Sequence, residues 1–224
     1  MKPNRVGKQF AFLCVAIGTG VASLSNPAFA AGASSTFNAD ADGWVVVDSS
    51  GNGGTTPATW NDGGYISTGD IYGWNSFGAP TKFLGNLLGQ KLSFDLSSSQ
   101  NDSAANTFFT VLIASGSTEL YWYGGTPSTN GFSSFSVNLD MPSTGWRIGG
   151  NGYSNSGAIV TQHEFASVLS NVTRLHIDAD WYVGPDNVRL DNVTISPVPE
   201  PETYAMMLAG LGLLGFMARR KRTA

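Results

Sequence analysis

Arg174-Leu-His-Ile-Asp-Ala-Asp-Trp181 alternates polar and apolar side chains along its whole length. The apolar side chains share one face, and Arg174, His176, Asp178 and Asp180 share the other. A period of two is typical of a β-strand with one buried face. Residues 91–96, which read KLSFDL, repeat the pattern, with the leucines and the phenylalanine on one side. Both segments therefore indicate strands rather than helices.

Further segments show the same alternation or a similar enrichment in β-branched and aromatic residues, namely 43–48, 106–114, 119–123, 132–139 and 187–195. In the last of these, Asp191 and Asn192 interrupt the alternation and predict a β-bulge. Clusters of Gly, Asn and Ser, such as 49–54 and 149–152, separate the segments. Many short strands between turns predict an all-β fold, a jelly-roll β-sandwich.

One short helix is expected after residue 160. Thr161 and Glu164 have the spacing of a capping box, in which each side chain binds a backbone amide at the helix start. Phe165, Val168 and Leu169 then form an apolar stripe with helical spacing. We expect this helix to close one end of the sandwich.

The composition excludes several classes of protein. The chain has 224 residues, of which 12% are charged and 28 are glycine, which disfavours a helical bundle and a highly charged disordered chain. Residues 31–196 hold five basic and fourteen acidic residues, a formal charge of -9. Such a body would repel phosphates, so we expect no nucleic-acid partner.

The N-terminus has the three parts of a secretory signal. Lys2, Arg5 and Lys8 form a positive region, and residues 10–24 are apolar. Ala28 and Ala30 then match the small-x-small pattern of a cleavage site. We expect a signal helix within residues 1–30, removed by signal peptidase after Ala30. The single cysteine, Cys14, lies in this leader, so the mature chain has none.

The C-terminus combines a short motif, an apolar run and a basic cluster. Val198, Pro199, Glu200 and Pro201 precede the apolar residues 203–218, which as a helix would span about 24 Å. The chain then reads Arg219, Arg220, Lys221, Arg222. A basic cluster after an apolar run stays on the cytoplasmic side, so residues 203–218 are predicted to be a membrane helix with the body outside.

These C-terminal residues resemble the PEP-CTERM sorting signal of Gram-negative bacteria, which has the same three parts in the same order. The resemblance implies an exosortase partner and processing near the Pro-Glu-Pro motif, in a bacterium that makes exopolysaccharide. The protein would be anchored in the membrane before processing and then reach the cell surface or the extracellular space. The alternative is a plain single-pass anchor. The expected domains are residues 1–30, 31–196 and 197–224.

The body shows a second resemblance. Residues 78–85, 89–96, 165–177 and 190–193 are similar, in this order, to blocks of the laminin B domain, also called laminin domain IV. The resemblance implies a jelly-roll sandwich like those of galactose-binding and carbohydrate-binding modules. It implies no catalytic residues, because the family has no established ones.

No catalytic residue is predicted from the sequence. The two histidines, His163 and His176, have no adjacent nucleophile, and no hydrolase elbow, metalloprotease helix or phosphate loop occurs. Asp178 and Asp180 lie two residues apart on one strand face. This spacing is compatible with the pair of catalytic carboxylates that a glycosidase uses. We interpret them instead as ordinary residues of a solvated strand face.

A structural Ca²⁺ ion is the one cofactor that the sequence suggests. Asp40 and Asp42 lie in an acidic turn at the start of the body, and Asp191 lies near its end. If the first and last strands are neighbours, the three carboxylates can supply oxygen ligands together with backbone carbonyls. The alternative is an acidic turn without metal.

Aromatic residues are the other candidates for binding. Trp60, Trp74, Tyr121 and Tyr123 are predicted to stack on sugar rings, with core and loop packing as the alternative. Tyr121 and Tyr123 share one strand face, and Trp122 takes the other.

Together these features predict an exported, non-catalytic extracellular binding or structural module, associated with exopolysaccharide or biofilm matrix. A polysaccharide is the expected ligand class. The alternatives are a glycan-active enzyme and a plain surface protein anchored by a single membrane pass.

Overall fold

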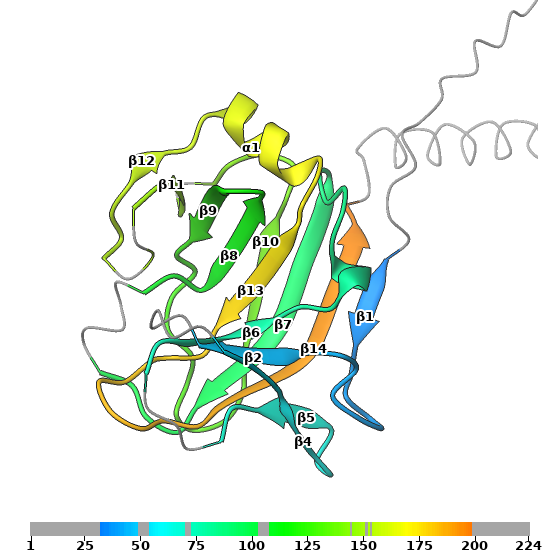
Figure 1. Cartoon of the computed structure of the whole chain (residues 1–224), viewed down its shortest axis with the longest axis vertical. Helices are drawn as coiled ribbons and strands as arrows, with labels where there is room; N and C mark the ends of the chain where they lie inside the picture. Colours follow the sequence, from blue (N-terminus) through cyan, green and yellow to red (C-terminus); the bar gives the residue numbers. More distant parts are fainter. Residues whose placement is uncertain are drawn as a thin grey trace, which may run out of the picture.

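The body of the chain is a sandwich of two antiparallel β-sheets (Figure 1). The structure, a computed structural model, describes residues 32–48, 54–69, 73–102, 108–143, 145–150, 152 and 154–198. The predicted signal helix of residues 1–30 and the predicted membrane helix of residues 203–218 lie outside this part of the chain. Within it, no helix is long and apolar enough to cross a membrane.

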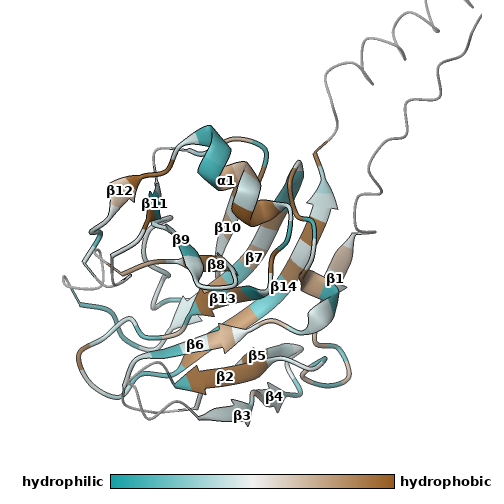
Figure 2. Cartoon of the chain, turned by 45° about the horizontal axis from the view of Figure 1, so that its top comes forward, coloured by the Kyte–Doolittle hydropathy of each residue, from teal (hydrophilic) through white to brown (hydrophobic). Residues whose placement is uncertain are grey.

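The first sheet, sheet A, is built around the two longest strands. Its path is β10 (Ser133–Asn138), β7 (Gln90–Ser98), β14 (Val188–Pro197), β5 (Tyr65–Ser67) and β4 (Thr59–Asn61), and β1 (Ala33–Ser35) also pairs with β14. Hydrophobic and pale bands alternate along β7 and β14 in Figure 2, as expected for strands with one buried face.

The second sheet, sheet B, has eight strands. Its order is β12 (Ala158–Ile159), β11 (Trp146–Ile148), β9 (Thr118–Trp122), β8 (Val111–Ser115), β13 (Arg174–Asp178), β6 (Asn75–Gly78), β2 (Val45–Asp48) and β3 (Thr55–Pro57). Some neighbouring strands of this sheet, such as β13 and β6, come from distant parts of the chain. The central strand β13 lies between β8 and β6.

One hydrophobic core fills the space between the sheets and extends under the helix. Its largest fully buried side chains include Trp44, Trp146, Trp181, Phe77 and Phe94. Helix α1 (Gln162–Leu169) lies at one end of the sandwich in Figure 1 and adds Phe165, Val168 and Leu169 to this core. A single-turn 3-10 helix, η1, covers Thr81–Phe83.

The predictions for the helix and the bulge are confirmed. Thr161 accepts from the Glu164 amide while the Glu164 carboxylate accepts from the Thr161 amide, which completes the capping box. The pairing of β14 with β7 shifts register between Asp191 and Thr194, and Asn192 adopts a φ of 51°. This left-handed conformation suits the extra residue of a β-bulge.

The all-β fold with one short helix is also confirmed, although strand boundaries differ. Each of the seven predicted segments contains a strand, but the segment 106–114 becomes strand only from Val111, and residues 106–107 lie outside the described part. The sequence reasoning missed seven strands of two to four residues, namely β1, β3, β4, β5, β6, β11 and β12. Strand β14 runs through Pro197, one residue beyond the predicted domain boundary.

Candidate binding site

A small pocket opens where the chain leaves β13 on its way to β14. Its volume is about 90 Å³, and its lining consists of Gly73, Trp74, Phe108, Asp180, Tyr182, Val183 and Gly184. The lining therefore combines three aromatic rings with one carboxylate. The beginning of β6 lies beside the end of β13, because the two strands are antiparallel (Figure 1).

Backbone pairing between β6 and β13 holds the two walls of the pocket together. The Ala179 amide donates to the Asn75 carbonyl at 3.0 Å, which extends the pairing past the end of β13. The buried Asn75 side chain donates to the Gly73 carbonyl at 2.6 Å. Asn75 therefore fixes the turn that carries Trp74 relative to the strand that carries Asp180.

The loop after β13 is anchored by carboxylates from two directions. The Asp186 carboxylate accepts from the Trp181 amide at 3.0 Å and from the Ser98 hydroxyl at 3.1 Å. The Asp102 carboxylate accepts from the Val183 amide at 3.0 Å. Gly184 lies against the Tyr182 ring, where a Cβ would come within 2.6 Å of it. A side chain at position 184 would therefore displace this aromatic wall.

Asp180 is the one carboxylate among the described residues that line the pocket. It is 5% exposed, and no hydrogen bond or ion pair from the described residues reaches its carboxylate. Burial, followed by the negative charges of Asp186 and Asp102, raises the pKa of Asp180 to about 7. Each of the charges that shift this pKa is negative, so the site lacks a neutralising cation within the described part of the chain.

Asp178 lies behind Asp180 on the same strand face and is fully buried. Among the described residues, no donor lies at normal hydrogen-bond geometry to either of its carboxylate oxygens. Burial, and next the charge of Asp180, raise its pKa well above the ordinary range, although the nearby amides of Ala179 and Asp180 partly offset the rise. The interpretation of Asp178 and Asp180 as solvated strand residues is therefore wrong, because both side chains are buried.

The remaining polar residues of β13 and its neighbours form a separate group. His176 Nδ1 lies 3.2 Å from the Ser76 hydroxyl, and burial, followed by the charge of Arg174, lowers the His176 pKa to about 4. Arg174 pairs with Glu119 at 2.6 Å, and Glu119 also accepts from the Tyr121 hydroxyl. His163 is exposed in the first turn of α1.

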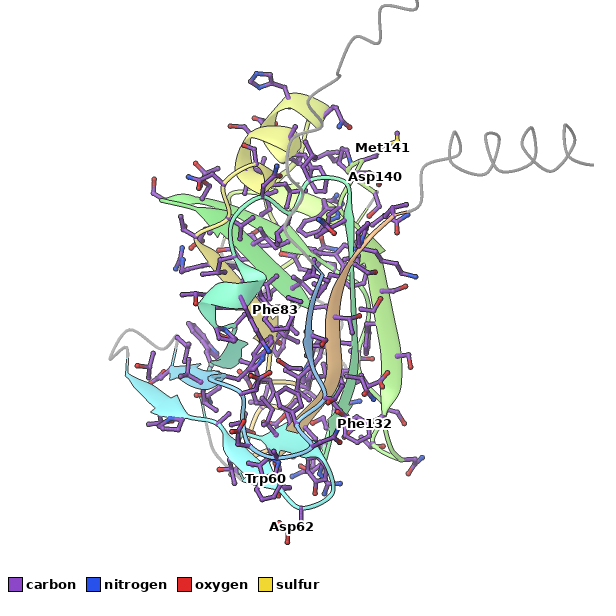
Figure 3. The ribbon with its side chains drawn as sticks, turned by 90° about the vertical axis from the view of Figure 1, so that its right-hand side faces the viewer. Trp60, Asp62, Phe83, Phe132, Asp140 and Met141 are labelled. Atoms are coloured by element: carbon purple, nitrogen blue, oxygen red, sulfur yellow. The ribbon has the colours of Figure 1, made fainter. Side chains whose placement is uncertain are left out.

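The four aromatic residues predicted to stack on sugars lie in different environments. Trp74 is 52% exposed and lines the pocket. Trp60 is 36% exposed, donates its indole N–H to the Phe37 carbonyl at 2.6 Å, and lies near Asp62 at one end of the molecule (Figure 3). The structure therefore leaves both tryptophan rings accessible but does not place Trp60 in the pocket.

Tyr121 and Tyr123 are not available in the same way. Tyr121 is 5% exposed and packs edge-on against Phe109, and Tyr123 is partly buried. Gly152 covers Tyr121 so closely that a Cβ at this position would lie 2.8 Å from the Tyr121 ring. The prediction that Tyr121 stacks on a sugar is therefore at odds with its burial. Trp122 does lie on the other face, against the main core.

The predicted calcium ligands do not form one site. Asp42 pairs with Lys82 and accepts from the Ser35 hydroxyl at 2.7 Å, while the Asp40 carboxylate accepts from the Asp42 amide. Asp191 accepts instead from the side chain and backbone of its neighbour in the bulge. Among the described residues, no group of three or more His, Cys, Asp or Glu is arranged to hold a metal ion. These residues therefore do not fit a shared Ca²⁺ ion.

The sandwich continues directly into the C-terminal motif. Pro197 ends β14, and the Val198 amide donates to the Gly89 carbonyl at 3.2 Å. Pro199, Glu200, Pro201 and the basic cluster of residues 219–222 lie outside the described residues, as do Ala28 and Ala30. The start of the motif is thus attached to the edge of a folded domain.

Comparisons with known proteins agree with this architecture. A family model for Laminin B (Domain IV) matches residues 76–202, and one for the PEP-CTERM protein-sorting motif matches residues 197–222. The L4b domain of human laminin alpha-2 superposes with a TM-score of 0.59 at 14% identity, covering 77% of this chain and 100% of that one. The comparison with curated proteins gives no match.

Two lower-scoring structures are also similar in part. An exo-beta-agarase has a TM-score of 0.40 at 12% identity, over 70% of this chain and 22% of its own. CtCBM11 has a TM-score of 0.38 at 15% identity, over 64% of this chain and 81% of its own. Neither score is high enough to support a functional argument.

The fold and the C-terminal motif define the class: an exported β-sandwich protein that carries an exosortase sorting signal. The family model covers more than half of the chain, and the chain belongs to the Laminin B (Domain IV) family. Neither the Laminin B domain nor the PEP-CTERM motif is a catalytic domain. Strands β1 to β5 precede the matched region and complete both sheets.

Proposed function

We propose that the protein is a non-catalytic binding module that is displayed outside the cell and attaches to a matrix polysaccharide. The observation that carries this proposal is Trp74, a half-exposed indole at a pocket on the sandwich. An exposed aromatic ring beside a concave site with few polar groups is typical of a small-molecule or sugar site. The sorting signal supports export to a surface where such polymers occur.

The domain organisation fits this role. Signal peptidase would remove residues 1–30, exosortase would act on residues 197–224, and the sandwich of residues 31–196 would remain as the working part. Its formal charge of -9 would keep it soluble and away from nucleic acids. The link to biofilm matrix is part of the same proposal.

Affinity electrophoresis of the exported protein tests polysaccharide binding. Gels would contain a neutral glucan, alginate or partly deacetylated chitin, and retardation in at least one of them is expected. The Trp74→Leu variant should lose most of the retardation, whereas Trp60→Leu, which alters a tryptophan outside the pocket, should keep it. Retardation in none of the gels, or equal loss in both variants, would overturn the proposal.

The enzyme alternative is supported by one observation, the pocket carboxylate Asp180, whose pKa of about 7 is in the range of a general acid. A glycosidase would release reducing ends from the bound polymer, and Asp180→Asn would stop the release. We expect no reducing ends from any polymer that the protein retains. Their appearance at a rate that depends on Asp180 would replace the binding module with an enzyme.

A further inference from the structure

The pocket beside Trp74 has an unusual charge balance. Four carboxylates, those of Asp178, Asp180, Asp186 and Asp102, influence one another at this end of sheet B. Two of them have structural partners, because Asp186 and Asp102 accept backbone amides of the loop after β13. Asp180 accepts no such amide among the described residues, and Asp178 has only the nearby amides of Ala179 and Asp180.

An almost completely buried carboxylate normally has a hydrogen bond or an ion pair, because desolvation of an unpaired charge is costly. Asp180 is 5% exposed, and the space it borders is the pocket itself. A cation in the pocket would therefore supply the partner that the rest of the described chain does not.

The walls of the pocket indicate which kind of cation fits. A metal ion such as Ca²⁺ requires six to eight oxygen ligands, and the described residues include no group of carboxylates arranged to hold one. Trp74, Phe108 and Tyr182 instead offer aromatic rings around a single carboxylate. Aromatic rings attract organic ammonium groups through cation–π interactions, and Trp is the strongest of them.

We propose that this pocket binds an organic ammonium group, with Asp180 as its counter-ion and Trp74 and Tyr182 as its aromatic walls. A volume of about 90 Å³ suits a group of the size of a protonated amine and its first substituents. The carboxylates of Asp186 and Asp102 add negative potential at Asp180.

The ammonium group can come from a small soluble amine or from the amino sugars of a polymer. In the second case the inference rests on the proposed function and specifies its ligand as a polysaccharide with free amino groups. The pocket chemistry is the same in both cases, so the two sources are separated by experiment.

Choline is the probe for the pocket, with the exported protein as the sample. Isothermal titration with choline chloride, against sodium chloride at equal ionic strength, should give saturable binding in the millimolar range or below. Asp180→Asn should weaken it at least about 10-fold, the effect of losing a buried ionic partner. Trp74→Leu should weaken it about 5-fold or more through the lost cation–π contact.

Two control variants make these results specific. Asp191→Asn removes a partly buried carboxylate outside the pocket, and Trp60→Leu removes an accessible tryptophan outside it. Both should keep the affinity of the unchanged protein. Asp180→Asn removes a buried negative charge, so we expect it to stay folded, and a thermal melt of each variant checks this directly.

The outcomes distinguish the inference from the proposed function. Choline binding together with Asp180-dependent retardation by partly deacetylated chitin supports both, and choline binding without retardation by any polymer supports the small amine as the source. Retardation by glucan or alginate without choline binding overturns the inference alone. Equal loss in Asp180→Asn and Asp191→Asn, no saturable choline binding, or Ca²⁺ binding that needs Asp180 but not Trp74 would also overturn it.

Discussion

Two acidic regions of the molecule differ in how the negative charge of their carboxylates is balanced. At the corner near β1, Asp42 has Lys82 and the Ser35 hydroxyl as partners. Partial burial alone would raise the pKa of Asp42, but these partners outweigh it and lower the pKa below its ordinary value. At the end of β13, the pKa of Asp180 is raised to about 7 because burial and two further carboxylates act in the same direction.

The difference separates an acidic turn that stabilises the fold from an acidic pocket that destabilises it. A carboxylate with a lowered pKa adds stability that is lost only in acid. A carboxyl group with a raised pKa binds its proton more tightly in the folded state. Its contribution to the free energy of unfolding therefore falls as the pH rises from about 4 through its pKa in the folded protein. The unfavourable charge at the pocket is what a cationic ligand would relieve.

The largest effect is expected when Asp178 and Asp180, whose pKa values are both raised, lose their charge. Asp178→Asn with Asp180→Asn should raise the melting temperature of the exported protein by about 5–10 °C at about pH 8, at roughly 2–4 °C per kcal/mol. This gain in melting temperature should disappear near about pH 4, where the two carboxyl groups of the unchanged protein bind protons in the folded and in the unfolded state. Thermal melts across this pH range would measure it, and a double variant that is less stable at about pH 8 would remove the contrast between the two regions.

A smaller effect of opposite sign is expected at the paired corner. Lys82→Met leaves Asp42 without its cation and should lower the melting temperature by about 1–3 °C at low salt, since exposed ion pairs contribute about 1 kcal/mol or less. The loss should shrink in high salt because the pair is partly exposed. Lys91→Met serves as the control for removal of a positive charge. An equal change in both variants would show that only net charge matters.

The smallest effect concerns calcium. Because Asp40, Asp42 and Asp191 have separate partners, excess Ca²⁺ and excess chelator should give melting temperatures within about 1 °C of each other. Differential scanning calorimetry with both additives is sufficient. A rise of several degrees with Ca²⁺ would restore the calcium site that the sequence suggests.

The alternation of residues 174–181 is enough to predict a strand, although β13 ends at Asp178. It is not enough to predict burial. Asp178 and Asp180 are both buried, and Asp180 lines a pocket with Trp74 and Phe108, which are distant in sequence. A period of two reports which side chains share a face and does not report what packs against that face.

The same reason explains the aromatic residues. Trp74 and Tyr121 are both predicted from the sequence to stack on sugars, yet Trp74 lines a pocket and Tyr121 packs closely against Gly152. The ion pair between Asp42 and Lys82 also joins residues that are 40 positions apart in the sequence, so local spacing does not reveal it. By contrast, the helix cap of Thr161 and Glu164 and the bulge at Asn192 depend on local spacing and were predicted correctly.

The central claim is that Asp180 is held in the pocket without a cation from the described part of the chain and gains one from a ligand. An NMR titration of the Asp180 carboxyl carbon in the exported protein, with and without choline, measures this most directly. The carboxyl should titrate near pH 7 in the protein alone and at a clearly lower pH when choline is bound. Titration near the ordinary value of 3.8 without ligand, or no shift at saturating choline, would contradict the account.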